Sequence, residues 1–398
     1  MKSSKLIQLL VLSVMAGCGS GGSDSSPVVS VPPPSGTANE IAITVNRSFS
    51  AAPNTPFVSV KVCPPGSSVC QTVDHILLDT GSYGLRIFKS ALNGLPLAQV
   101  TVGSASVAEC IPFLDGSGVW GPVQMADVYL GGEPKVTVPI QVIDATFGSV
   151  PPVCSPPNVA SLDQNPTQAG FNGILGVGLF VQDCGTGCAV SANNQVYFSC
   201  NGTACGGAAV PVASQVQNPV AHLPQDNNGV LVQLPKVPAG GMPSSSGLLV
   251  LGIGTQPNNS TTGVTTYPTS QFGDFTTQFS GISYTNSFID SGSNGLFFNG
   301  SPSQLPPCTS NSSWFCPPAT VLLSATNIGA GGAPIGSVPF AIGNAENLFR
   351  SANNVFAELG GESFGGFDWG LPFFLGRKVF VGIEGKSSGL GNGPYWAY

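Results

Sequence analysis

The sequence predicts an all-β protein made of two related halves. Short apolar runs rich in Val, Ile and Phe alternate with clusters of Gly, Pro, Asn and Ser, a pattern typical of many strands joined by turns. Long stretches of helical periodicity are nearly absent. Each half also contains one Asp-Ser/Thr-Gly-Ser motif directly after an apolar run, so the two halves resemble each other.

The composition excludes several classes of protein. Charged residues make up 8% of the 398 residues, and 12 Lys and Arg face 19 Asp and Glu, for a formal net charge of −7. Such a chain lacks the basic surface that nucleic acid requires, so we expect no nucleic-acid partner. Hydrophobic residues at 42% provide a large core and exclude global disorder. The two histidines, His75 and His222, are too few for a histidine-rich metal site.

Residues 1–17 are expected to be a secretory signal peptide. Lys2 and Lys5 form a short basic region, and an apolar stretch follows over residues 6–15. That stretch is too short to span a bilayer as a permanent helix, whereas it fits a cleaved export signal.

Residues 15–18, Met-Ala-Gly-Cys, resemble the lipobox of bacterial lipoproteins. The resemblance implies that Cys18 is acylated and anchors the mature chain to a membrane of the cell envelope. In that family Gly19 is not an inner-membrane retention signal, which indicates the outer membrane of a Gram-negative bacterium. The alternative is an ordinary signal peptide with an incidental cysteine. Residues 18–40, rich in Gly, Ser and Pro beyond the cysteine, are expected to form a flexible linker.

The remaining cysteines form an even set, which in an exported chain indicates up to five disulfides. We expect two local pairs, Cys63 with Cys70 and Cys308 with Cys316. The other six cysteines allow fifteen connectivities, among which the sequence does not choose. A four-thiolate zinc site is the alternative for four of them, although we expect no metal. These six are Cys110, Cys154, Cys184, Cys188, Cys200 and Cys205, and the last four are the zinc candidates.

The candidate strands are apolar runs bounded by turn residues, and examples in chain order are 42–45, 58–62, 100–102, 136–142, 229–234 and 248–252. Helices are expected only over 90–92 and 346–356. The proline density of residues 151–166 predicts a long loop. Residues 235–246 predict a connection between two lobes.

The expected N-terminal lobe covers residues 41–240 and the C-terminal lobe covers residues 241–398. In the first lobe the motif is Asp79-Thr80-Gly81-Ser82, and in the second lobe it is Asp290-Ser291-Gly292-Ser293. Each motif follows an apolar strand. One copy alone would be an ordinary turn, and hairpin tips remain the alternative for both. A matched pair predicts a shared site.

Two carboxyls held together can share one proton, because like charges at contact distance do not both ionise. One carboxyl then serves as an acid and the other as a base, as amide hydrolysis requires. In this interpretation the glycines let the backbone pass close to the carboxyls and donate N–H groups. Thr80 and Ser291 brace the two turns against each other, and Ser82 and Ser293 orient the carboxylates.

On these residues the sequence resembles the pepsin-like aspartic proteases. Phe171–Gly178 resembles the family segment that passes behind the first catalytic turn, and residues 230–234, 247–254 and 369–384 resemble later strands. The resemblance implies a bilobal double β-barrel with a central cleft, catalytic Asp79 and Asp290, and no cofactor. It also implies a peptide or protein substrate in the cleft. The lipobox together with this pattern also resembles a family of uncharacterised bacterial lipoproteins that shares this fold.

The resemblance further implies a flap hairpin at Asp115, Gly116, Ser117 and Gly118, with Trp120 close by. Asp115 replaces the tyrosine that the family carries near the flap tip, and Arg86 replaces the tryptophan behind that tyrosine. An Arg86–Asp115 ion pair is our hypothesis for this departure, with two solvated loop residues as the alternative. We therefore expect a lipid-anchored aspartic endopeptidase. The alternative is a catalytically silent pepsin-like protein that binds peptides or proteins.

Overall fold

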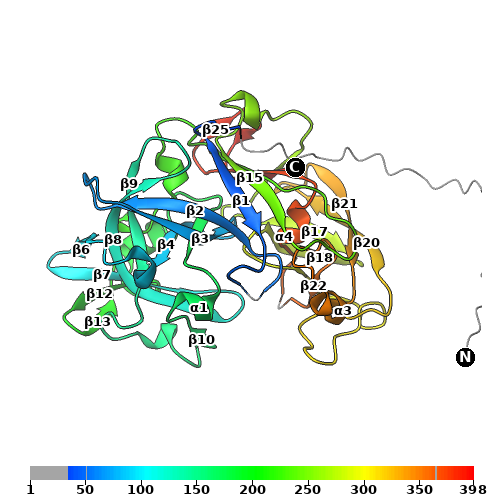
Figure 1. Ribbon diagram of the computed structural model, residues 1–398, viewed down its shortest axis with the longest axis horizontal. Coiled ribbons are helices and arrows are strands. Elements are labelled where there is room, and N and C mark those ends of the chain that lie inside the picture. The colour runs from blue at the N-terminus through cyan, green and yellow to red at the C-terminus, as the bar shows by residue number, and fades with distance from the viewer. Residues whose placement is uncertain (1–34, 51, 364) are drawn as a thin grey trace, which may run out of the picture.

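A computed structural model describes residues 35–50, 52–363 and 365–398 (Figure 1). The expected signal peptide 1–17, the lipidation site Cys18 and most of the linker 18–40 lie outside the described residues. The protein is all-β with barrel-like sheets, and 42% of it is strand and 10% helix. Among the described residues, no helix is both long enough and apolar enough to cross a bilayer.

The strands form one large network and two smaller sheets. The 18 strands of the network are β1 (Glu40–Val45), β2 (Pro56–Cys63), β3 (Gln71–Asp79), β4 (Tyr83–Phe88), β5 (Ala98–Gln99), β6 (Thr101–Val102), β7 (Ala105–Pro112), β8 (Ser117–Tyr129), β9 (Val136–Ile143), β10 (Ser161–Leu162), β11 (Gly173–Val177), β12 (Tyr197–Asn201), β13 (Ala204–Gly207), β14 (Gly229–Gln233), β15 (Ser245–Leu251), β16 (Thr266–Pro268), β24 (Lys378–Gly382) and β27 (Tyr395–Ala397). The seven-stranded sheet contains β17 (Phe275–Phe279), β18 (Ile282–Ile289), β19 (Leu296–Phe297), β20 (Val321–Ile328), β21 (Ile335–Ile342), β22 (Gly360–Gly361) and β23 (Asp368–Trp369). A small hairpin pairs β25 (Ser387–Ser388) with β26 (Gly391–Asn392).

The helices are short because apolar periodicity never extends over several helical turns. The α-helices are α1 (Pro166–Ala169), α2 (Thr186–Val190), α3 (Ala345–Arg350) and α4 (Leu371–Phe374), and the 3-10 turns are Lys89–Leu92, Pro152–Cys154, Val212–Ser214, Pro219–His222 and Pro257–Asn259. Both expected helices are present, although the one expected over 346–356 ends at Arg350. The loop expected over 151–166 contains only a 3-10 turn, the short strand β10 and the start of α1.

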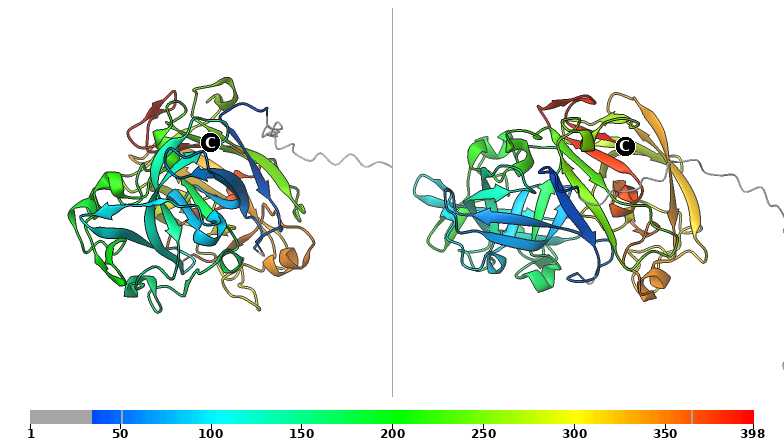
Figure 2. Two further views of the ribbon diagram at one scale, coloured as in Figure 1. Left: turned by 60° about the vertical axis from the view of Figure 1, so that its left-hand side comes forward. Right: turned by 45° about the horizontal axis from the view of Figure 1, so that its top comes forward.

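Strands from both ends of the chain meet in an antiparallel array between the two halves. β1 pairs with β15, β15 with β14, β14 with β24, β24 with β27, and β27 with β16. Figure 1 shows β1 and β15 side by side, with β2 to β4, β6 to β10, β12 and β13 on one side and β17, β18 and β20 to β22 on the other. The turned views of Figure 2 show the same two parts. Strands that precede residue 240 therefore pair with strands that follow it, although the sequence predicts the boundary between lobes at this residue.

One apolar core runs through both halves. It includes Leu78 and Ile289, the residues just before each motif aspartate, and both are fully buried. The second half adds an aromatic cluster in which the rings of Phe367 and Trp369 lie 4.4 Å apart, and those of Phe298 and Phe367 lie 4.9 Å apart. Stacked and edge-on rings stabilise a core beyond the area they bury. Packing in this core therefore fixes the positions of the strand ends that carry the motifs.

The ten described cysteines form five disulfides. Cys63–Cys70 and Cys308–Cys316 confirm the two expected local pairs. The other pairs are Cys110–Cys154, Cys184–Cys188 and Cys200–Cys205. The alternative of one zinc site is therefore wrong, because its four cysteines are consumed in two separate disulfides.

Loop length predicts which disulfide stabilises the fold most. Cys110–Cys154 spans 44 residues and Cys200–Cys205 spans 5. Replacing both cysteines of the longer loop by Ala is expected to lower the free energy of unfolding by about 4 kcal/mol, against about 2 kcal/mol for the shorter loop. Denaturant titration of the two double variants measures this difference, and equal losses would contradict it.

Candidate active site

The two motif aspartates follow strands that lie in the same three-stranded arrangement, one in each half. In the first half β11 lies between β3 and β4, parallel to β3 and antiparallel to β4, so that Gly176 faces both Asp79 and Gly84. In the second half β23 lies in the same way between β18 and β19, and Trp369 faces both Ile289 and Leu296. Each turn thus leaves the end of a buried strand and is fixed on both sides.

The two turns interlock through reciprocal hydrogen bonds. The backbone N–H of Thr80 donates to Ser291 Oγ over 3.1 Å, and the N–H of Ser291 donates to Thr80 Oγ1 over 2.9 Å. Each hydroxyl also donates across the interface: Thr80 Oγ1 to the carbonyl of Ile289 over 3.0 Å, and Ser291 Oγ to that of Leu78 over 2.7 Å. Both side chains are buried. The hydroxyls therefore brace the turns as the motif predicts.

Each carboxyl is held by its own turn. Asp79 Oδ1 accepts the N–H groups of Gly81 and Ser82 at 2.7 and 3.2 Å, and Asp79 Oδ2 accepts the Ser82 hydroxyl at 2.5 Å. Asp290 Oδ1 accepts the N–H of Gly292 at 2.7 Å, and Asp290 Oδ2 accepts the Ser293 hydroxyl at 2.8 Å. Three donors therefore stabilise negative charge on Asp79, whereas two face Asp290.

The two carboxyls lie against each other. A Cβ atom added to Gly81 would lie 2.6 Å from Asp290 Cγ, and one added to Gly292 would lie 2.9 Å from Asp79 Cγ. Only glycine leaves room for this approach. The pKa of Asp290 lies well above its ordinary value, chiefly because the carboxyl is buried. The negative charges of Asp79 and Asp368 and a hydrogen bond to Asp79 raise it further. These surroundings therefore favour the protonated form of Asp290.

The pair is reachable from solvent. Gly81 is exposed, and Ser82, Asp290, Gly292 and Ser293 are partly exposed, although Asp79 itself is only 7% exposed. Solvent therefore reaches Asp290 and the turn residues around it, whereas Asp79 is largely covered.

The expected flap residues lie at the tip of the β7–β8 hairpin. Asp115 Oδ1 accepts both the N–H and the hydroxyl of Ser117, at 2.8 and 2.7 Å. The carbonyl of Gly116 accepts the N–H of Ala160 at 2.7 Å, and β8 pairs with β10 through Ser117 and Gly118. Residues 160–162 therefore support the hairpin tip. Within the described part of the chain, no hydrogen bond joins this tip to either motif aspartate.

Trp120 is not part of the exposed hairpin tip. Its side chain is fully buried, its Nε1–H donates to the carbonyl of Phe147 over 2.7 Å, and its ring packs edge-on against Phe198. It belongs to the apolar cluster around Cys110 and Cys154.

The hypothesis of an Arg86–Asp115 ion pair is wrong. Arg86 is buried in β4, and its Nη2 pairs with Glu109 at 3.0 Å and Asp183 at 2.9 Å. Asp115 lies on the exposed hairpin tip, so it does not reach this interior position. A buried guanidinium requires a buried partner, and Glu109 on β7 and Asp183 supply it.

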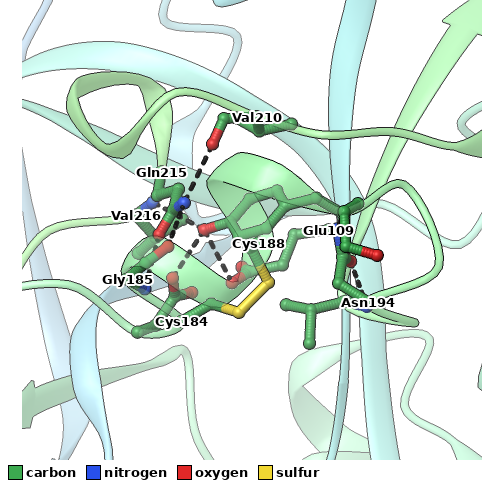
Figure 3. Close-up of a disulfide and its surroundings, with 12 residues drawn as sticks. Glu109, Cys184, Gly185, Cys188, Asn194, Val210, Gln215 and Val216 are labelled. Carbon is green, nitrogen blue, oxygen red and sulfur yellow. Dashed lines mark hydrogen bonds between the residues drawn. A yellow bond between two sulfur atoms is a disulfide. The ribbon is translucent and has the colours of Figure 1, made fainter.

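Sequence reasoning also missed the rest of this buried cluster. The Tyr197 hydroxyl donates to Asp183 Oδ1 over 2.6 Å and accepts the N–H of Val216 at 2.7 Å. Burial and the charge of Glu109 raise the pKa of Asp183 well above its ordinary value. Figure 3 shows Glu109 near the Cys184–Cys188 disulfide. The sequence offered one signal for this cluster, because Arg86 is a charged residue between the apolar Leu85 and Ile87 within β4.

The donors for a metal are limited in the described residues. Cys308, Cys316 and Glu346 place ligand atoms within 4.8 Å of one another. The two cysteines are joined in a disulfide, so neither offers the thiolate that a metal would bind. The arrangement around Asp79 and Asp290 is instead one that can polarise a water molecule and protonate a carbonyl oxygen.

A family model matches residues 35–398, and the chain belongs to that family, DUF3443, a protein family of unknown function. A search of curated proteins found no match.

Removing the shared hydroxyl of Thr80 is expected to loosen the interlock. Thr80→Val leaves the buried N–H of Ser291 and the carbonyl of Ile289 without their partner, which costs about 1–3 kcal/mol for each group. Thr80→Ser keeps the hydroxyl and serves as the control. Thermal and denaturant unfolding measure both variants, and equal stability of Thr80→Val and the parent protein would contradict the interlock.

Arg86 is expected to be essential for stability. Arg86→Met leaves two buried acidic groups without their cation, at a cost of about 3–5 kcal/mol. Arg350→Met removes an exposed arginine and is expected to change stability by less than about 0.5 kcal/mol. The same unfolding assay compares the two, and an unaffected Arg86→Met variant would be inconsistent with the buried cluster.

Proposed function

We propose that this protein is an aspartic-type endopeptidase with a pepsin-like bilobal fold. The observation that carries the proposal is the interlocked pair of turns that holds Asp79 and Asp290 together at a solvent-accessible position. The repeated strand arrangement behind both turns, with β11 in one half and β23 in the other, supports the same assignment.

The reaction follows from the different surroundings of the two carboxyls. Asp79, with three donors, serves as the carboxylate base and takes a proton from water. The water oxygen bonds to the carbonyl carbon of a peptide, while Asp290 gives its proton to the carbonyl oxygen. A tetrahedral diol results. The proton on Asp79 then passes to the amide nitrogen, and the C–N bond breaks while a diol hydroxyl returns its proton to Asp290. A carboxyl and an amine terminus result, and both aspartates regain their starting protonation.

The substrate is an extended peptide or unfolded protein segment lying between the two halves. At the hairpin tip Gly118 already pairs with β10 on one side and with Pro112 of β7 on the other, so an added substrate strand would have to pair elsewhere. The five disulfides support a location outside the reducing cytosol. We propose attachment to the cell envelope through Cys18, with the outer membrane of a Gram-negative bacterium as the site.

A peptide- or protein-binding role without catalysis is the second candidate. The observation that favours it is the hairpin tip, where Asp115 satisfies its own turn and residues 160–162 hold the tip in place. Such a tip moves less readily over a substrate than a free hairpin does.

Asp79→Asn and Asp290→Asn are each expected to lower kcat/KM on an unfolded protein substrate by about 10²- to 10⁴-fold, because each removes one partner of the acid–base pair. Asp74→Asn, on an exposed position of the same strand β3, is the matched control and should retain activity. The assay covers about pH 3 to pH 7 with and without pepstatin. Cleavage that survives both dyad substitutions would identify a contaminant. A folded protein that binds peptides but never cleaves them would favour the second candidate.

A further inference from the structure

The backbone carbonyl four residues after each motif aspartate accepts a hydrogen bond from a side chain. In the first half this carbonyl belongs to Tyr83, and it accepts the Nη1–H of Arg86 at 2.8 Å. In the second half it belongs to Asn294, and it accepts the Nδ2–H of Asn54 at 2.9 Å. Arg86 lies in the same half as the turn that it contacts, whereas Asn54 belongs to the opposite half. The second turn is therefore anchored by a side chain from the first half.

The side-chain amide of Asn54 is hydrogen-bonded through both of its polar atoms. Besides Asn294, its Nδ2 donates to the carbonyl of Phe356 over 2.9 Å, and its Oδ1 accepts the N–H of Phe356 at 2.8 Å. Two carbonyls can only accept, so the group that faces both must be the NH₂ group. Asn54 is fully buried, and its φ of 56° is one that asparagine adopts more readily than most residues. Asn54 therefore joins two segments of the second half, the turn and the chain at Phe356.

Asn54 is also close to the strand that carries Asp79. It lies two residues before β2, and β2 pairs with β3 so that Phe57 faces Leu77. Leu77 lies two residues before Asp79 on β3. A short stretch of chain thus connects the backbone beside Asp79 to the amide that contacts the second turn.

The contact with Asn294 lies next to the groups that hold Asp290. Asn294 directly follows Ser293, whose hydroxyl donates to Asp290 Oδ2 over 2.8 Å. The carbonyl of Ser293 accepts the N–H of Leu371 at 2.7 Å, so the second half itself holds this peptide group. The next carbonyl, that of Asn294, is held by Asn54 instead. Movement of this carbonyl would shift Ser293, and with it the hydroxyl that orients Asp290.

We propose that Asn54 is a positioning residue of the active site, whose side-chain amide fixes the turn of Asp290 against the first half. The interlock of Thr80 and Ser291 fixes the start of this turn, and Asn54 fixes its end. Because Asn54 is fully buried, it acts on the reaction through the turn and not through contact with a substrate. The effect on catalysis rests on the proposed function, whereas the effect on the geometry of the two aspartates does not.

Asn54→Gly removes the amide, and glycine adopts the φ of 56° without strain. We expect kcat on an unfolded protein substrate to fall about 10- to 100-fold while KM stays within about threefold, because a small displacement of a catalytic group slows the chemical step. The assay is run at a temperature at which the variant is folded. A kcat equal to that of the parent protein would overturn the proposal.

Asn259→Ala is the matched control, because Asn259 is also fully buried. Its amide likewise makes three hydrogen bonds, donated to the carbonyl of Leu251 and the hydroxyl of Thr255 and accepted from the N–H of Gln256. This variant should lose stability but keep kcat within about threefold, because it leaves the turn of Asp290 untouched. Equal losses of kcat in the two variants would overturn the proposal, because they would reflect general destabilisation.

Asn54→Asp is the second variant, for use if Asn54→Gly does not fold. A neutral aspartic acid keeps the acceptor for the N–H of Phe356, but it has one proton for the two carbonyls that Asn54 Nδ2 contacts. Its kcat at acid pH should be about three- to tenfold below that of the parent protein. An undiminished kcat would again count against the proposal.

A further measurement does not depend on catalysis. The charge of Asp79 is one cause of the raised pKa of Asp290, so a turn that moves away from Asp79 should bring that pKa closer to the ordinary value. In ¹³C NMR titration the Asp290 carboxyl should have a lower midpoint in Asn54→Gly and an unchanged one in Asn259→Ala. The same midpoint in Asn54→Gly and in the parent protein would overturn the proposal. If the parent protein cleaves no substrate, the proposed function fails, and the titration still decides whether Asn54 positions Asp290.

Discussion

The interlock of Thr80 and Ser291 is the constraint on which the rest of the site depends. Four hydrogen bonds cross between turns that lie 211 residues apart in the chain, and each turn gives and receives two of them. Buried hydrogen bonds of this kind are strongly directional, so they fix the distance and the orientation of the turns together. The carboxyls of Asp79 and Asp290 approach each other because their turns cannot separate.

The surrounding fold supplies the rigidity and the electrostatics that this contact requires. Strands β11 and β23 pass behind the two turns, and the apolar core continues from Leu78 to Ile289. Burial then raises the free energy of a second negative charge at the pair, which favours the protonated form of Asp290. The two halves are alike in backbone and unlike in side chains: the first buries Arg86 with two acids, and the second buries Asp368 without a cation.

Much of this arrangement was predictable from the sequence, and the reason is local chemistry. A strand end followed by Asp-Ser/Thr-Gly-Ser predicts a turn, and one such copy in each half predicts that the two turns meet. The even number of cysteines indicated disulfides, but the partner of Cys110 was not predictable, because the pairing joins β7 to a turn beyond β9. Arg86 was assigned the wrong partner, because sequence offsets do not reveal that its side chain enters the interior. Asp368 was missed because an acid between two aromatic residues has no turn or motif to mark it.

The sharing of one proton between Asp79 and Asp290 is tested most directly by ¹³C NMR titration of the aspartate carboxyls, with the resonance of Asp290 assigned from its loss in Asp290→Asn. We expect Asp290 to titrate well above the ordinary aspartate range of about 3.9, and to move back toward that range in Asp79→Asn, where the neighbouring charge is gone. An Asp290 resonance that titrates at the ordinary value, and that ignores the Asp79 substitution, would show that the carboxyls act independently and would contradict the account.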